Sequence, residues 1–149
     1  MFDYVSKINE LRTNRFCCSQ ILISLALEIK GCENAEVRHE LLRAMNGLCR
    51  GMESGKDCGA LTGGACAIGL ICGRGENDEI PHNMLKEMLK ELAEWFEYEY
   101  GSVECSVLTG GDIQRCKEMC PGIIRRTFEN AVRIMQDNGV GINLDITGC

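Results

Sequence analysis

Apolar residues recur at every third or fourth position along most of the chain, which is the spacing of one face of an α-helix. In the segment 17–30, four aliphatic residues carry this repeat: Ile21, Leu22, Leu25 and Ile29. In the segment 36–48, it is carried by Val37, Leu41, Met45 and Leu48. Together with an amphipathic stretch near residues 3–11, these repeats predict three helices in the first third of the chain.

The longest repeat begins near Pro81, and proline is favoured at the first helical position because its missing N–H would be unpaired there anyway. Its broad apolar stripe consists of Met84, Leu85, Met88, Leu89, Leu92, Trp95 and Phe96. Pro121 is expected to begin another helix in the same way. The apolar face of that helix consists of Ile124, Phe128, Ala131, Val132 and Met135. The glycine-containing tail, residues 137–149, is predicted to be loose.

The segment 58–72 contains no charged residue and is rich in glycine, alanine and cysteine. A helix that is apolar on every side belongs in the centre of a bundle, and small residues let neighbouring backbones approach it. Its 15 residues are too few to span a membrane. No hairpin or long strand pattern appears. The sequence therefore predicts an all-α fold, a single-domain helical bundle of about five to six helices over residues 1–149, with this segment as its buried central helix.

Eleven of the 149 residues are cysteine, and the net charge is −6. The negative charge argues against nucleic acid as a partner, and no segment predicts a membrane partner. Residues 1–10 lack the basic and apolar runs of a secretory signal, which predicts a cytoplasmic protein. Because disulfides are rare in a reducing compartment, metal ligation, redox chemistry and plain burial are three open explanations for the cysteines.

A short internal echo involves two of these cysteines. The segments 58–64 and 105–111, Cys-Gly-Ala-Leu-Thr-Gly-Gly and Cys-Ser-Val-Leu-Thr-Gly-Gly, are identical at five of seven positions. If each cysteine starts a helix, backbone N–H groups and the helix dipole would favour its thiolate, the form that binds metals or attacks disulfides. The alternative is two glycine-containing turns that happen to follow a cysteine.

Cys116 and Cys120 are separated by three residues, and Pro121 follows. A Cys-x3-Cys-Pro ending occurs in some iron–sulfur proteins. No Cys-x2-Cys pair is present, so the sequence supports neither a zinc ribbon nor a thioredoxin-like motif.

The remaining cysteines and the histidines suggest no site. Cys66 and Cys72 lie in the apolar segment and are predicted to be small core residues. No partner is evident for Cys32, Cys49 and Cys149. His39 and His82 have charged or polar neighbours, and both are expected at the surface.

The order of four cysteines resembles the redox-active proteins named for a C_GCAxxG_C_C pattern. The resemblance covers residues 17–136 and is carried by Cys18-Ser19-Gln20, Cys58-Gly59-Ala60-Leu61-Thr62-Gly63, Cys105, Leu108-Thr109-Gly110, Asp112-Ile113 and Cys120-Pro121. It implies a mostly helical domain with four hallmark cysteines: Cys18, Cys58, Cys105 and Cys120. The chain departs from the pattern in reading Asp-Cys-Gly-Ala rather than Gly-Cys-Ala, and in having few glycines and an extra cysteine in the segment 47–52.

Three hypotheses follow for these four cysteines. They would hold an iron–sulfur cluster for electron transfer, with Cys17 and Cys116 as auxiliaries and a redox partner protein supplying or taking the electron. Alternatively, Cys58 would form a thiol–disulfide couple with Cys105 or Cys120. The third hypothesis is a structural zinc site in an interaction module. No hydrolase or transferase motif is present, enzymatic activity stays open, and a homodimer is compatible with the sequence.

Overall fold

Seven α-helices make up most of residues 2–144, the part of the chain that the computed structural model describes. They are α1 (Tyr4–Thr13), α2 (Cys18–Lys30), α3 (Ala35–Met45), α4 (Gly59–Cys72), α5 (Leu85–Tyr100), α6 (Cys105–Thr109) and α7 (Ile113–Asp137). A 3₁₀ turn (Asn46–Leu48) and a tight turn (Gly51–Gly55) connect α3 to α4. The predicted all-α fold is confirmed, with the five-residue α6 as an element that periodicity did not indicate.

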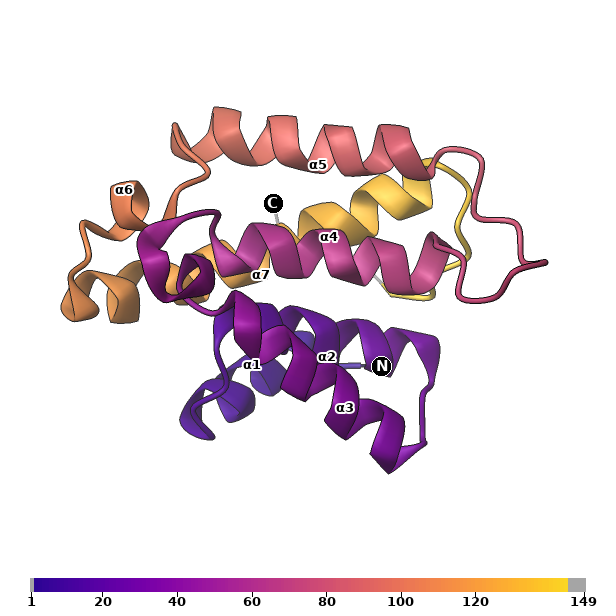
Figure 1. Ribbon diagram of the computed structural model, residues 1–149, viewed down its shortest axis with the longest axis horizontal. Helices are drawn as coiled ribbons and strands as arrows, with labels where there is room; N and C mark the ends of the chain where they lie inside the picture. The colour runs from indigo at the N-terminus through magenta and orange to yellow at the C-terminus, as the bar shows by residue number, and fades with distance from the viewer. Residues whose placement is uncertain (1, 145–149) are drawn as a thin grey trace.

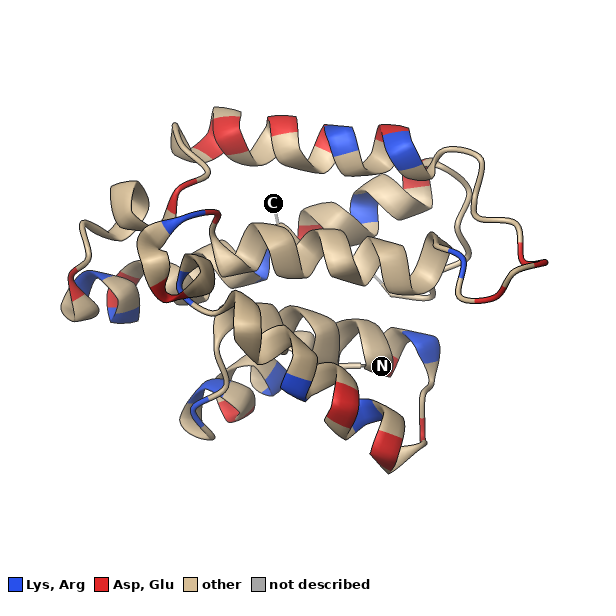
Figure 2. Ribbon diagram, in the orientation of Figure 1, with Lys and Arg blue, Asp and Glu red and all other residues tan. Residues whose placement is uncertain are grey.

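The helices are arranged in three layers (Figure 1). Helix α5 forms one outer layer, α4 and α7 form the middle layer, and α1, α2 and α3 form the other outer layer. Helix α4 packs on α2, α5 and α7, so it is the predicted central helix. The ribbon of α4 carries no charged residue, whereas the outer edge of α5 is lined with them (Figure 2).

Two glycines of α4 are required by close packing against neighbouring helices. A Cβ added at Gly63 would lie 2.8 Å from the Cα of Ser19 in α2, and one at Gly64 would lie 2.9 Å from Cγ2 of Thr127 in α7. Only glycine allows helices to approach this closely. Cys72 is buried as predicted, but Cys66 is only half-buried, because it lies on a side of α4 that its neighbours cover incompletely.

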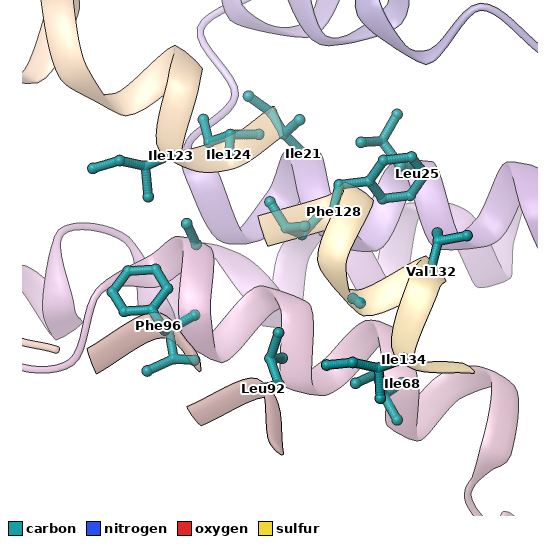
Figure 3. Close-up of a cluster of buried hydrophobic side chains, with 14 of the residues drawn as sticks. Ile21, Leu25, Ile68, Leu92, Phe96, Ile123, Ile124, Phe128, Val132 and Ile134 are labelled. Atoms are coloured by element: carbon teal, nitrogen blue, oxygen red, sulfur yellow. The ribbon is translucent and has the colours of Figure 1, made fainter. Parts of the chain in front are cut away.

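The core lies between α2, α4, α5 and α7 (Figure 3). Leu92 and Phe96 of α5 and Val132 of α7 are fully buried, and Phe128 is 1 % exposed. These residues belong to the predicted apolar stripes of the two helices, so the helical periodicity identified the buried faces correctly.

Neither proline begins a helix, and both predictions of a helix start were wrong. Helix α5 begins at Leu85, because the N–H of His82 donates to the carbonyl of Cys72 and holds the preceding segment against the end of α4. Pro121 lies inside α7, which begins eight residues earlier at Ile113, where the side chain of Asp112 accepts the N–H of Gln114.

Two peripheral segments differ from expectation. Helix α3 buries only Met45 of its predicted face, and Val37 is 45 % exposed, since α3 lies at the edge of the bundle and packs mainly on α2. The tail is anchored at Leu144, which is buried and whose carbonyl accepts a bond from Gln136. Residues 145–149, and with them Cys149, lie outside the described residues. None of the helices in the part described is long and apolar enough to cross a membrane.

Candidate functional site

A cavity of about 190 Å³ is lined by residues at the starts of α2, α6 and α7 and by the N-cap residue of α4. These helix starts lie at the same end of the bundle (Figure 1). Six cysteines line it: Cys17, Cys18, Cys58, Cys105, Cys116 and Cys120. All four hallmark cysteines and both predicted auxiliaries therefore lie around one space. Most of the remaining lining is apolar, including Phe16, Ile21 and Leu108.

Cys18 is the first residue of α2, and the N–H of the preceding Cys17 donates to Oε1 of Gln20. The sulfur of Cys18 lies against Gly59, where an added Cβ would be 3.1 Å from Cys18 Sγ and 3.1 Å from the carbonyl oxygen of Leu48. The glycine of the Cys-Gly-Ala block thus makes room for another cysteine and for the chain before it.

The two echoed segments lie side by side. The N–H of Cys58 donates to the carbonyl of Val103, and that of Cys105 donates to the carbonyl of Lys56, both at 2.7 Å. A single antiparallel bridge joins Asp57 to Glu104 between these bonds. Each cysteine stands at a helix start, Cys58 as the N-cap of α4 and Cys105 as the first residue of α6.

Helix α7 supplies the other two cysteines of the cavity. Cys116 and Cys120 are one helical turn apart and face the same side. This placement depends on the early start of α7, because a helix beginning at Pro121 would have left both residues in a loop.

Burial raises the pKa of the four hallmark thiols. It raises the pKa of Cys58 to about 12, against the N–H groups of Ala60 and Leu61, which lower it. It also raises the pKa of Cys120 to about 12, with four neighbouring cysteines adding to the effect. These neighbours are Cys18, Cys116, Cys58 and Cys105. The backbone groups at the start of α4 do favour the Cys58 thiolate, as the sequence suggested for a helix start, but desolvation outweighs them and the net shift of the pKa is upward.

Two cations that sequence reasoning missed, Arg12 and Arg50, also line the cavity. Arg50 has a left-handed backbone (φ 53°), as do Met52 and Glu53 after it. Left-handed φ at non-glycine residues is costly and is found where the surrounding structure enforces it. No motif in the sequence predicts such a turn, although it also contains two glycines with positive φ, Gly51 and Gly55.

A disulfide joins Cys17 to Cys49, with Cα atoms 5.8 Å apart. It links the residue before α2 to the residue before Arg50. The partner of Cys49, which was not evident from the sequence, is therefore Cys17. Cys17 lines the cavity as expected of an auxiliary, but its sulfur is bonded to Cys49. The other eight described cysteines are free thiols.

Among residues 2–144, no group of three or more His, Cys, Asp or Glu side chains is arranged to hold a metal ion. His39 is exposed, and His82 accepts the N–H of Met84 through Nδ1, so neither histidine joins the cysteine cavity.

The fold and the cavity define an all-helical protein whose chain brings distant cysteines to one end of a bundle. A family model described as "Putative redox-active protein (C_GCAxxG_C_C)" matches residues 16–134. The chain belongs to this redox-active family, which confirms the resemblance seen in the sequence. No curated protein and no solved structure matches the chain.

Proposed function

We propose that Cys18, Cys58, Cys105 and Cys120 hold an iron–sulfur cluster that serves electron transfer. The observation that carries this proposal is the cavity of about 190 Å³, around which four separate segments bring these four cysteines. Four thiolates are the ligand set of both [2Fe–2S] and [4Fe–4S] clusters. Each iron of a [4Fe–4S] cluster binds one cysteine, and each iron of a [2Fe–2S] cluster binds two. A cluster therefore does not require three protein side chains around a single metal ion, the arrangement that is absent from residues 2–144.

The residues around the four thiols suit this group. Backbone groups near two of the sulfurs favour the thiolate against the effect of burial: those of Cys18, Ser19 and Arg50 lower the pKa of Cys18, and those of Ala60 and Leu61 lower the pKa of Cys58. Such donors tune the reduction potential of a cluster, which supplies one-electron transfer when bound. Arg12 and Arg50 line the cavity and would balance the negative charge of four thiolates.

Burial raises the pKa of these thiols, which is compatible with metal binding and disfavours a reactive thiolate in the metal-free protein. Burial keeps Cys58 and Cys120 protonated at neutral pH, since both have a pKa of about 12. Metal binding replaces these protons, whereas an attacking thiol in an exchange reaction works best with a pKa near ambient pH. The cysteines of the cavity therefore favour the metal proposal over a Cys58 couple with Cys105 or Cys120.

The test is an anaerobic visible spectrum of the full chain, with assays of iron, zinc and acid-labile sulfide. We expect a brown protein containing iron and sulfide, and loss of both in Cys58→Ser and Cys105→Ser. Cys66→Ser is the matched control, because Cys66 is a half-buried free thiol of α4 that does not line the cavity. A colourless protein after reconstitution with iron and sulfide would contradict the proposal. Equimolar zinc without iron would support the structural zinc alternative instead.

A second candidate function, thiol–disulfide chemistry, has one observation in its favour. The structure contains a disulfide at the wall of the cavity, although it joins Cys17 and Cys49 rather than the cysteines expected from the sequence. Mass mapping of the oxidised and reduced protein would show whether this bond opens and closes.

A further inference from the structure

We propose that the Cys17–Cys49 disulfide is a two-electron couple that receives its electrons through the four-cysteine centre. The inference rests on the proposed cluster and assigns it an acceptor within the same chain. Cys17 lines the same cavity as the four hallmark cysteines, and Cys18 is its neighbour in the sequence. A proposed cluster ligand and a cysteine of the disulfide are therefore consecutive residues of the chain.

The two sulfurs differ in their surroundings. Cys17 is half-buried and belongs to the cavity wall. Cys49 is 6 % exposed and is not part of that wall. An electron arriving from the cavity consequently reaches the disulfide at Cys17, while Cys49 stays shielded behind it.

Polar groups beside both sulfurs suit the reduced state. Oγ of Ser19 lies 3.3 Å from the sulfur of Cys17, and Oδ1 of Asn46 lies 3.5 Å from the sulfur of Cys49. After reduction, the Cys49 thiol can donate to Oδ1 of Asn46, and the Cys17 thiol can donate to Oγ of Ser19. Ser19 is itself held in place, because its hydroxyl donates to the carbonyl of Met45 at 2.8 Å. Neither thiol would be left without a polar neighbour.

The reaction balances as a two-electron reduction. The sulfur–sulfur bond of Cys17 and Cys49 breaks, two electrons enter, and two protons from solvent complete the two thiols. The electrons come one at a time from a low-potential one-electron carrier, which is oxidised in two equivalents. A one-electron centre next to a disulfide is suited to this conversion, because a disulfide needs both electrons to open fully.

The experiment compares the full chain with and without its cluster, starting with the Cys17–Cys49 bond oxidised. Reduced methyl viologen serves as the one-electron donor, samples are quenched with iodoacetamide, and alkylated peptides are counted by mass spectrometry. We expect Cys17 and Cys49 to become alkylated at least tenfold faster in the iron-loaded protein. In a reductive titration, iron-loaded Cys49→Ser should take up two fewer electrons per chain than wild type.

Cys32→Ser is the matched control, because Cys32 is a free thiol that does not line the cavity, and its electron uptake should equal that of wild type. Equal alkylation rates with and without the cluster would overturn the inference while leaving the cluster proposal intact. Unchanged electron uptake in Cys49→Ser would do the same. Absence of iron and sulfide after reconstitution would overturn both proposals.

Discussion

The segments 58–64 and 105–111 share five of seven residues, yet the first begins a helix of 14 residues and the second a helix of five. Their beginnings are alike. In each, the threonine hydroxyl donates to the carbonyl of the cysteine four residues earlier, Thr62 to Cys58 at 3.4 Å and Thr109 to Cys105 at 2.7 Å. The shared residues thus build the same helical turn after each cysteine.

The two segments diverge at their glycine pairs. Gly110 and Gly111 have φ of 63° and 70°, and this left-handed conformation ends α6. Gly63 and Gly64 remain helical, because α2 and α7 pack directly against them. The same dipeptide therefore ends one helix and continues the other, and tertiary packing decides between these outcomes.

The difference has a consequence for the cavity. The end of α6 lets the chain turn at once into α7, which begins at Ile113 and carries Cys116 and Cys120 to the cavity. Helix α4 continues instead and forms the centre of the bundle. The segment 58–64 thus supplies Cys58 and the start of the central helix, whereas the segment 105–111 supplies Cys105 and the turn into α7.

The largest effect that tests this comparison is expected from Gly63→Ala. Its Cβ would lie 2.8 Å from the Cα of Ser19, and backbone cannot move aside without shifting α2. We expect a loss of about 1–3 kcal/mol in the free energy of unfolding, measured with urea. Because Ser19 follows Cys18, bound iron should fall as well. Unchanged stability would mean that α2 and α4 are not in such close contact.

Gly110→Ala should have the next largest effect. Alanine at a φ of 63° is strained, which costs about 1–2 kcal/mol of unfolding free energy. Gly110→Asn is the control, because asparagine tolerates the left-handed region and should recover most of the loss. If both variants were equally stable, the end of α6 would not depend on the left-handed residue.

Much of the fold follows from local patterns. The periodicity of α5 and α7 identified their most deeply buried residues, and the absence of charge in 58–72 identified the central helix. In α2 the burial is wider than the periodicity predicted, because every residue from Ser19 to Leu27 is buried, whereas Ile29 is only partly buried. The order of the cysteines selected four residues, and closeness in sequence added Cys17 and Cys116 as auxiliaries; all six line one cavity. These features can be predicted from the sequence because a helical face or a family motif depends on consecutive or regularly spaced residues.

The features that the sequence did not reveal depend on contacts between distant segments. Cys49 meets Cys17 only because the chain after α3 returns to the start of α2, across a separation of 32 residues. The left-handed Arg50 is enforced by its surroundings rather than by its residue type. Pro121 is tolerated within α7, because the cap at Asp112 and the buried residues beyond Pro121 keep the helix continuous.

Asp112→Ala tests where α7 begins and should have a smaller effect. Loss of the bond from the N–H of Gln114, 2.8 Å long, should cost about 1 kcal/mol of unfolding free energy. Amide hydrogen exchange in residues 113–120 should become faster. Asp112→Asn should behave like wild type, because asparagine caps equally well. If Asp112→Ala left exchange unchanged, packing at the cavity rather than the cap would hold the first two turns of α7.

Gly69→Ala should have the smallest effect and the opposite sign. Gly69 lies in the same helix as Gly63, six residues later, but no atom lies within 4 Å of an added Cβ. Alanine at such a position removes the entropic cost of glycine, so the free energy of unfolding should rise by about 0.5–1 kcal/mol. A loss of stability in Gly69→Ala would mean that the close contact with α2 does not distinguish Gly63 from Gly69. A gain at Gly69 with a loss at Gly63 would locate the requirement for glycine at the contact between α4 and α2, beside Cys18.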